Sequence, residues 1–457
     1  MTGPALPDGR LLAWYGDDFT GSAAVMEVLS FGGLEAVLFL DVPTPEQLAA
    51  FPKARAVGIA GVARSQPPSW MDVHLPPVFA ALADMQAPLV HYKVCSTLDS
   101  SPAIGSIGHA LDLAETVFGS TWIPTLIAAP PIGRYQAFGQ LFAAAEGTVH
   151  RIDRHPVMSR HPVTPMHESD VARHLALQTA LPGACLDLLA LRSPDGGAAA
   201  LRSLRAAGTR IVTFDTIDYS DLAAVGRLIW EQRGERVLAV GSQGVEYALL
   251  TYWQQVGAVP PPVPLASAGS VSQIVAVSGS VSATTAAQIE WSARHGFGLV
   301  AFDAAAVASD PAMAAAIDSA VQQAKATLDS GQSVLVHSAR GPEDPAVAEY
   351  RAAISASGFE LAEANARIGQ ALGRILDRLL SETGIGRAVI SGGDTSGHAA
   401  LQLGVEALTA LAPTISGAAL CTAHRAGRPP LELALKGGQM GTPDYFGWIR
   451  DGGGPRP

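Results

Sequence analysis

The segment Leu11–Gly21 reads LLAWYGDDFTG and sets the expectation for the fold. A short apolar run breaks at Gly16-Asp17-Asp18, and Thr20 then precedes an apolar stretch with helical spacing. This order predicts a strand, a tight loop and a helix. Because short apolar strands that alternate with helices are typical of parallel sheets covered on both faces, we expect an α/β fold.

The same alternation continues through both halves of the chain. The strand candidates are Leu11–Tyr15, Ala36–Leu40, Ala56–Ala60, Leu89–Tyr92, Thr125–Ala129, Ile211–Phe214, Arg236–Val240, Ile274–Val277, Gly298–Phe302, Ser333–His337, Ala388–Ile390 and Leu431–Leu435. Between the halves, Val256–Ser272 reads VGAVPPPVPLASAGSVS, whose prolines stop either regular element. We expect two α/β domains with mainly parallel sheets, residues 1–258 and 273–457, a linker at 259–272 and an active-site cleft between the domains.

Composition excludes several classes of protein. The chain has 457 residues, of which 48% are apolar and 16% charged, so it can bury large cores and is not disordered. A net charge of −11 argues against binding to nucleic acid or anionic membrane. The start MTGPALPDGR lacks the pattern of a signal peptide, and no window holds the roughly 18 apolar residues of a membrane span. Three scattered cysteines support neither disulfides nor a zinc site, so we expect a cytoplasmic protein.

Three glycine-rich segments follow strand candidates in the second half: Ser278–Thr285, Ser391–Gly397 and Lys436–Gly441. Small residues let backbone amides approach an anion, and a following helix adds its partial positive charge. Asp394 could hold Mg²⁺ or a nucleotide hydroxyl, and Lys436 is a natural point charge for a phosphate oxygen. None of the segments matches a P-loop or GxGxxG, and ordinary turns with helix caps are the alternative. Together they favour a phosphate or nucleotide site.

A different set of residues follows the strands of the first half. Asp17 and Asp18 come after the first strand, where parallel sheets bind ligands, and either could be a general base. The alternative is a helix cap beside a solvated aspartate. Arg64 and Lys93 follow two further strands and could clamp a carboxylate, or they could be surface charges.

Two tempting sites carry less weight. His155, His161 and His167 recur at regular spacing in Arg151–Asp170, but the first two precede prolines, which leaves no helix to align them. We therefore assign no metal ligands and expect a rigid loop that covers a cleft. Cys95 lacks an identifiable base partner, so a buried thiol is favoured over a nucleophile.

The order of these motifs resembles the four-carbon acid sugar kinase family, two-domain ATP-dependent kinases of small sugar acids such as threonate and erythronate. The matching positions are Gly16–Gly21, Arg64-Ser65, Tyr92-Lys93 with Ser96–Leu98, His161–Pro165, Gly241–Gly244, Ser278–Ser280 with Ser282, Thr285 and Gln288, Gly392–Thr395, and Lys436–Gly438 with Gly441. The resemblance spans nearly the whole chain, and it implies that the N-terminal domain binds the sugar acid and the C-terminal domain binds ATP.

The resemblance also implies roles for individual residues. On the substrate side it implies Asp17, Asp18, Arg64, Lys93, Ser96 and Thr97. Near ATP it implies Ser278, Ser280, Gly392, Gly393, Asp394, Thr395 and Gly438.

One departure from the family pattern concerns the substrate. The family commonly reads KxDSTLRGN, whereas Lys93–Ser101 reads KVCSTLDSS, so Cys95 replaces an acid and Asp99 replaces an arginine. The altered charge argues against simple threonate. This sequence motif, with Arg134–Gly139 and Arg154–Pro156, resembles that of the family branch that acts on oxidised branched sugar acids such as 3-oxo-isoapionate.

The resulting hypothesis is a kinase that moves the γ-phosphoryl group of ATP, with Mg²⁺, onto a hydroxyl of a sugar acid. Arg64 and Lys93 would orient the substrate, and Asp17 or Asp18 would accept the hydroxyl proton. Two alternatives stay open: a nucleotide-responsive sensor that binds a sugar acid without turnover, and a phosphosugar lyase or hydrolase. The sequence leaves the oligomeric state open, a homo-oligomer included.

Overall fold

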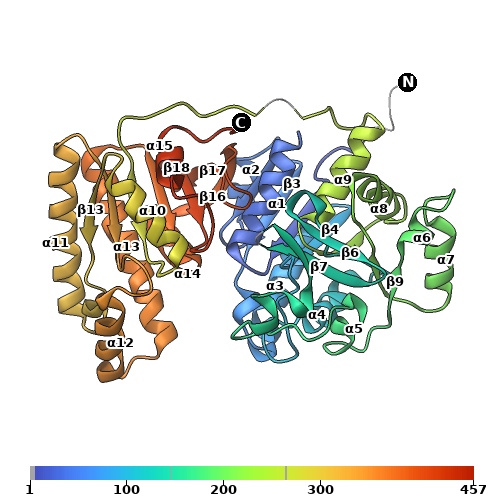
Figure 1. Ribbon diagram of the computed structural model, residues 1–457. Helices are drawn as coiled ribbons and strands as arrows, with labels where there is room; N and C mark the ends of the chain where they lie inside the picture. Colours follow the sequence, from blue (N-terminus) through green and yellow to red (C-terminus); the bar gives the residue numbers. More distant parts are fainter. Residues whose placement is uncertain (1–5, 146, 263–264, 457) are drawn as a thin grey trace. The chain divides into compact units, whose positions relative to one another are not determined.

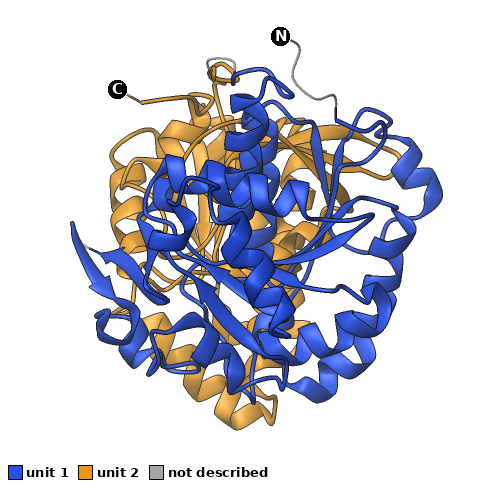
Figure 2. Cartoon of the chain, turned by 90° about the vertical axis from the view of Figure 1, so that its right-hand side faces the viewer, with its two compact units in different colours: residues 1–263 blue, residues 264–457 orange. Residues whose placement is uncertain are grey.

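The computed structural model describes residues 6–145, 147–262 and 265–456. The chain divides into two compact units, residues 1–263 and 264–457 (Figure 1, Figure 2). This division falls inside 259–272, where the sequence predicts a linker. The prediction of two α/β domains with mainly parallel sheets is confirmed. The domain bounds and the cleft stay predictions.

The main sheet of unit 1 is parallel throughout, in the order β2-β3-β1-β4-β11-β5-β10-β9. Its strands are β1 Leu12–Gly16, β2 Ala36–Phe39, β3 Ala56–Ala60, β4 Leu89–Lys93, β5 Ile123–Leu126, β9 Gly183–Leu186, β10 Ile211–Phe214 and β11 Val237–Gly241. The chain lays β2 and β3 on one side of β1 and then crosses to β4 on the other side. The carboxyl ends of β1 and β4 therefore flank a topological switch point, where open parallel sheets bind ligands.

Helices and a small antiparallel sheet complete unit 1. The helices are α1 Phe19–Phe31, α2 Pro45–Ala49, η1 Ala63–Ser65, α3 Pro68–Asp84, α4 Ile107–Phe118, η2 Pro130–Ile132, η3 Ile152–Arg154, η4 Met158–Arg160, α5 Val171–Ala176, α6 Leu188–Leu191, α7 Ala198–Ala206, α8 Tyr219–Glu231 and α9 Gly244–Gln255. The small sheet consists of β6 Arg134–Ala137, β7 Gln140–Ala145 and β8 Thr148–Arg151.

The turn from β1 into α1 confirms the predicted strand, loop and helix. Asp18 is the N-cap of α1, and its Oδ1 accepts a hydrogen bond from the Gly21 amide at 2.9 Å. A Cβ atom on Gly16 would lie 1.9 Å from the Ser22 hydroxyl oxygen, so only glycine fits. All of β1 is buried, since both faces of the sheet are covered.

Unit 2 has the strand order β13-β14-β12-β15-β18-β17-β16, parallel as far as β18 and antiparallel beyond it. Its strands are β12 Val275–Ser278, β13 Phe297–Ala301, β14 Ser333–His337, β15 Arg387–Ser391, β16 Val405–Ala412, β17 Leu420–Arg425 and β18 Arg428–Lys436. Its helices are α10 Ala283–Ala293, η5 Ala304–Ala308, α11 Asp310–Asp329, α12 Pro345–Ser357, α13 Leu361–Thr383, α14 Gly393–Gln402 and α15 Tyr445–Arg450. Helices α10 and α15 cover one face of the parallel strands, and α11 and α13 cover the other (Figure 1).

The core of unit 2 determines where its polar strand ends point. Ala276, Val389 and Ala434 pair from strand to strand and pack in the core that α10 and α15 cover. Two residues further along these strands come Ser278, Ser391 and Lys436, also paired in register and buried. Because side chains alternate with a period of two, these polar groups lie on the same face, at the N-terminal end of α10.

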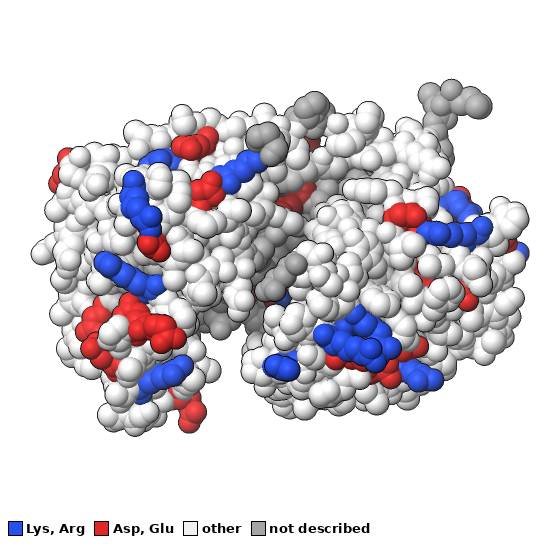
Figure 3. Space-filling model, in the orientation of Figure 1, with Lys and Arg blue, Asp and Glu red and all other residues white. Residues whose placement is uncertain are grey.

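On the face drawn in Figure 3, the described basic and acidic side chains are interspersed. Within the described residues, no helix has the length and apolar character needed to cross a membrane.

Candidate functional site

The predicted substrate residues of unit 1 meet at the carboxyl edge of its sheet. Asp17 and Asp18 follow β1, Arg64 lies in η1 after β3, and Lys93 ends β4. The Asp17 amide donates to the Lys93 carbonyl at 2.9 Å, and the Arg64 amide donates to the Asp17 carbonyl at 2.9 Å. The structure thus brings together four side chains that lie up to 76 positions apart in sequence, from Asp17 to Lys93.

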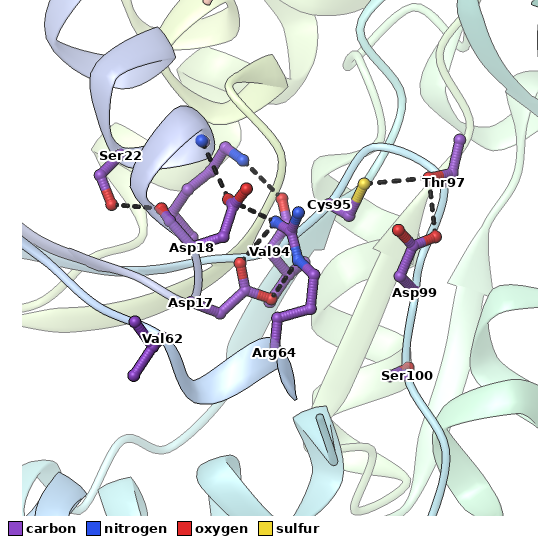
Figure 4. Close-up of polar contacts among 12 residues, drawn as sticks. Asp17, Asp18, Ser22, Val62, Arg64, Val94, Cys95, Thr97, Asp99 and Ser100 are labelled. Atoms are coloured by element: carbon purple, nitrogen blue, oxygen red, sulfur yellow. Dashed lines mark hydrogen bonds and ion pairs between the residues drawn. The ribbon is translucent and has the colours of Figure 1, made fainter. Parts of the chain in front are cut away.

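Arg64 holds both aspartates (Figure 4). Its Nη2 lies 2.6 Å from Asp17 Oδ1 and 2.6 Å from Asp18 Oδ1, and its Nε lies 3.3 Å from Asp17 Oδ2. The guanidinium is therefore already engaged by two carboxylates. It orients them before it could contact the carboxylate of a substrate.

The two aspartates have different environments. Burial raises the pKa of Asp17 above its usual value, although Arg64 opposes the shift. Burial would also raise the pKa of Asp18, but Arg64 and Lys93 outweigh it and hold this pKa below its usual value. Asp17 has 2% of its side chain exposed and Asp18 has 25%, so Asp18 is the carboxylate that a ligand can reach.

Lys93 is a buried cation beside this pair. Its Nζ donates to the Val94 carbonyl at 2.7 Å. A Cβ atom on Gly21 would lie 2.7 Å from Lys93 Nζ and 2.4 Å from Asp18 Oδ1, so the absence of a side chain at Gly21 keeps the lysine close to the carboxylate. Because Lys93 is buried, it is not a surface charge, which was the alternative that the sequence left open.

The loop after β4 is held by its own side chains (Figure 4). Cys95 Sγ lies 2.9 Å from Thr97 Oγ1, which donates to Asp99 Oδ1 at 2.8 Å. The Thr97 hydroxyl is thus used within the loop, whereas Ser96 is partly exposed. Burial and the charge of Asp99 raise the pKa of Cys95, so its thiol stays protonated near neutral pH. Leu98 has a φ of +63°, a strained conformation for leucine that tertiary packing maintains.

Arg134 is a further candidate that sequence reasoning did not assign to the site. It opens β6, shortly after the carboxyl end of β5, and its Nη1 donates to the carbonyls of Ile132 and Gly133 at 3.2 Å. Its Nε is buried without a hydrogen-bond partner, and the described residues offer it no carboxylate at ion-pair distance. Burial lowers the pKa of Arg134, and the electrostatic interactions with Cys95 and Asp99 oppose this shift. The sequence signals were its place after a strand of the main sheet of unit 1 and the segment Arg134–Gly139, on which the resemblance to the branch partly rests.

The predicted nucleotide residues of unit 2 converge on one cradle. A Cβ atom on Gly279 would lie 2.3 Å from Thr395 Oγ1, and one on Gly438 would lie 2.4 Å from Ser280 Oγ. Ser282 caps α10 by accepting a hydrogen bond from the Thr285 amide. All three glycine-rich segments therefore contribute backbone at close range to the start of α10, as an anion site requires.

The second of these segments is not a loop throughout. Helix α14 begins at Gly393, so Gly393, Asp394 and Thr395 form its first turn. Gly392 precedes it with a φ of +132°, which an L side chain rarely adopts. The first-turn amides of a helix have no intrahelical partner and can bind an anion. The side chain of Asp394 lies outside the described residues.

A pocket of about 370 Å³ adjoins the cradle. Gly279, Ser280, Gly392, Gly393 and Thr395 line its polar end, whereas Ser278 and Gly438 do not line it. The apolar lining comes from Ala304, Ala339, Val347, Tyr350, Leu361 and Ile368. Sequence reasoning missed this part because apolar residues on α12 and α13 are indistinguishable from core positions. Ser338, Arg351 and Asn365 also line the pocket. A pocket that combines polar and apolar groups suits a nucleotide.

Two of the histidines of Arg151–Asp170, His155 and His161, accept hydrogen bonds within turns. His155 Nδ1 accepts from the amides of Val157 and Met158, and His161 Nδ1 accepts from the amide of Thr164. Across the described residues, no group of three or more metal-ligating side chains is placed to hold an ion.

Comparisons with known proteins agree with this division of the chain. Residues 12–249 match the family model of a sugar-binding N-terminal domain, and residues 275–446 match that of a nucleotide-binding C-terminal domain. The chain is 47% identical over 450 residues to a 3-oxo-isoapionate kinase of Paraburkholderia graminis, covering 98% of this chain and 96% of that protein. It is 31% identical over 447 residues to a 3-oxo-tetronate kinase of Methylobacterium radiotolerans, covering 95% of this chain and 97% of that protein.

Solved structures share the fold. A Salmonella typhimurium LT2 protein described as a tRNA synthase has a TM-score of 0.78 and 24% identity, covering 96% of this chain and 98% of its own. A Haemophilus influenzae protein of the DUF1537 family has a TM-score of 0.73 and 22% identity, covering 96% and 99%. At these identities the likeness concerns the fold alone.

The fold and the two sets of polar residues define a two-domain enzyme with one unit for a nucleotide and one for a small polar substrate. The family models and the relatives then specify the chemistry. The chain belongs to the four-carbon acid sugar kinase family, and it is an ATP-dependent sugar-acid kinase. The alternatives of a sensor, a lyase or a hydrolase are not favoured.

Proposed function

We propose that this kinase phosphorylates 3-oxo-isoapionate, or a closely related branched oxo acid, at one of its hydroxyl groups. The observation that carries the proposal is the 47% identity with a 3-oxo-isoapionate kinase over nearly the whole chain. Identity with two 3-oxo-tetronate kinases is lower, at 30% and 31% over a similar length. The changed charges at Cys95 and Asp99 support a substrate other than simple threonate.

Asp18 is our choice for the group that accepts the proton of the substrate hydroxyl. It is the more exposed of the two aspartates, and a general base must be within hydrogen-bond reach of the proton it takes. The hydroxyl oxygen forms the new bond to the γ-phosphorus, the bond from that phosphorus to the β-γ bridging oxygen breaks, and ADP leaves. Asp17 and Arg64 then act by holding Asp18 in position.

Arg134 and Lys93 are our choice for binding the carboxylate of the sugar acid. Both are cations at the carboxyl edge of the unit 1 sheet, and neither makes an ion pair within 4 Å among the described residues. A guanidinium can bind a carboxylate through two parallel hydrogen bonds, whereas the ammonium of Lys93 acts as a point charge. Ser96, which is partly exposed in the same loop, can contact a hydroxyl.

The nucleotide would place its base in the apolar part of the unit 2 pocket and its phosphates on the cradle. Mg²⁺ bound to ATP neutralises phosphate charge and takes most of its ligands from phosphate oxygens and water. The described residues of the cradle offer hydroxyls and amides to the phosphates and include no group of three metal-ligating side chains, which suits an ion that arrives bound to ATP. The use of ATP supports our proposal that the enzyme is cytoplasmic, and a homo-oligomer stays a prediction.

A coupled assay of ADP formation tests the substrate. We expect kcat/KM for 3-oxo-isoapionate to exceed that for 3-oxo-tetronate by at least about tenfold, as contacts with the extra substrate groups discriminate at this level. Threonate and a reaction without acid are the controls. Equal or faster turnover of 3-oxo-tetronate would sink the substrate assignment while leaving the kinase activity intact.

A further inference from the structure

Lys436, the last residue of β18, is a buried cation that the proposed mechanism does not yet use. Its side chain is 0% exposed. Its Nζ donates to the Gly437 carbonyl at 3.1 Å, lies 3.4 Å from Thr285 Oγ1 and stands 5.9 Å from the centre of the Tyr445 ring. Among the described side chains, no carboxylate lies at ion-pair distance from it.

The lysine stands behind the nucleotide cradle and does not line the pocket. The Thr285 hydroxyl connects the two: it lies 3.0 Å from Ser280 Oγ, and it donates to the Gly438 carbonyl at 2.8 Å. The Lys436 carbonyl also accepts a hydrogen bond from the Gly392 amide at 2.9 Å. Through these contacts Lys436 reaches the first, second and third glycine-rich segments.

The protein groups around Lys436 do not by themselves compensate its charge. A buried ammonium loses its hydration, and two hydrogen bonds to neutral oxygens do not replace it. The N-terminal ends of α10 and α14 add partial positive charge at the same edge of the sheet. Burial accordingly lowers the pKa of Lys436 to about 8. Ser391, in register beside it, has a buried hydroxyl without a hydrogen-bond partner. A polyanion in the cradle would offset this arrangement.

We propose that Lys436 is a positioning residue for the polyphosphate of the nucleotide, whose charge it compensates from behind the cradle through Thr285 and the backbone of Gly437 and Gly438. The binding energy it contributes therefore grows with the number of phosphates. The inference rests on the proposed nucleotide site, and it assigns a role to a residue that does not line the pocket.

Calorimetric titration of the full chain with adenosine, ADP and ATP tests this role. For Lys436→Met we expect Kd to rise about 100-fold for ATP, about tenfold for ADP and less than about twofold for adenosine, because the lost attraction scales with ligand charge. Lys436→Arg keeps the charge and should recover at least about tenfold of the ATP affinity. Lys325→Met, which removes an exposed lysine paired with Glu382, is the matched control and should change none of the three.

Thermal unfolding supplies a second readout that a merely structural lysine would not give. Without nucleotide, Lys436→Met should unfold at a higher temperature than the wild type, because it removes a buried cation without an ion-pair partner. Saturating ATP should raise the unfolding temperature of Lys436→Met by less than it raises that of the wild type. Equal weakening for all three ligands, or a lower unfolding temperature without nucleotide, would overturn the role of Lys436. A wild type that binds no nucleotide would instead overturn the proposed nucleotide site.

A milder variant keeps the test decisive if Lys436→Met does not fold. Thr285→Val removes the hydroxyl that connects Lys436 to Ser280 and leaves the lysine in place. The same order, with ATP weakened most and adenosine least, supports the proposal. An unchanged ATP affinity contradicts it.

Discussion

At the carboxyl edge of the unit 1 sheet, Asp17 and Asp18 each lie 2.6 Å from Arg64, with Lys93 buried beside them. At the carboxyl edge of the unit 2 sheet, the cradle offers hydroxyls and backbone amides, with Lys436 as a buried cation behind them and His337 buried at the end of β14. The cluster of Asp17, Asp18, Arg64 and Lys93 holds two negative and two positive charges, whereas Lys436 has no carboxylate at ion-pair distance among the described residues. Both edges use the same location, the ends of parallel strands.

The difference reflects what each ligand brings. A sugar acid carries one negative charge and several hydroxyls, so its site needs both donors and acceptors, and an internally balanced set of ions supplies them. A polyphosphate carries several negative charges and no acidic hydrogen that needs a base. Its site can therefore rely on amides, which attract phosphate without adding a formal charge, and this explains how a chain with net charge −11 binds two anions.

The largest expected effect breaks the balance in unit 1. Asp18→Asn keeps an N-cap for α1, since asparagine caps as well as aspartate, but it removes the charge and the proton acceptor. We expect kcat to fall by about 10² to 10⁴ with little change in the KM for ATP, measured by steady-state kinetics. Asp170→Asn, at the N-cap of α5, is the matched control. A kcat within a factor of a few of the wild type would exclude Asp18 as the base.

The second effect concerns the charge of Lys436 in unit 2. The pKa of Lys436 is about 8 in the folded chain and near 10.5 when unfolded, so the unfolded chain binds more protons between these values. Without nucleotide, the free energy of unfolding of the wild type should therefore rise with pH from about 8 to 10, relative to Lys436→Met, by about 2 to 3 kcal/mol. Denaturant titrations of both proteins at pH 7, 8, 9 and 10 measure this difference. If the difference in the free energy of unfolding between the two proteins stays constant with pH, burial does not destabilise the ammonium of Lys436 in the protein without nucleotide.

The third effect tests whether Arg134, and not Arg64 of the ion-pair cluster, binds the substrate carboxylate. Arg134→Gln should raise the KM for the sugar acid about 10- to 100-fold and leave the KM for ATP unchanged, because a charge-assisted bidentate contact is lost. Added guanidinium ion should restore part of the activity. Arg173→Gln, an exposed arginine of α5, is the control. If KM is unchanged while kcat falls, Arg134 does not bind the carboxylate.

The smallest effect tests the close packing of the unit 2 cradle. In Gly438→Ala the new Cβ would lie 2.4 Å from Ser280 Oγ, so the serine must turn away. We expect the KM for ATP to rise about tenfold, with the sugar-acid KM unaffected. Gly386→Ala, where a Cβ meets no atom within 4 Å, is the control. Wild-type kinetics for Gly438→Ala would mean that the Ser280 position is unimportant for the nucleotide.

The sequence predicts the parts of the molecule that depend on local pattern. The buried strand Leu12–Gly16, with the aspartates and helix that follow it, could be read from the order of apolar residues, glycine and capping residues. The strand predicted at Thr125–Ala129 lies at Ile123–Leu126 instead, because an apolar run reports burial and not where strand pairing ends. The antiparallel strands β16 and β17 were missed, since their pairing is set by contacts distant along the chain.

The candidate site divides in the same way. Residues directly after strands were identified, because the topology of a parallel sheet brings strand ends together. Tyr350 and Ile368 were not, because they reach the pocket from the middle of helices α12 and α13, where an apolar residue carries no sign of a ligand. The role of Arg134 was not predicted either, although Arg134–Gly139 was part of the resemblance, since nothing in its sequence surroundings tells that its Nε is buried without a partner.

The register of the unit 2 sheet has a consequence for how such a site can change. Ser278, Ser391 and Lys436 pair across three strands, so the cation is aimed by strand alignment and not by a loop. Shifting β18 by one residue would turn Lys436 to the opposite face and place Leu435 beneath the cradle. A single inserted or deleted residue in β18 therefore removes the cation from this site, and it turns the buried side chains of the strand to the opposite face as well.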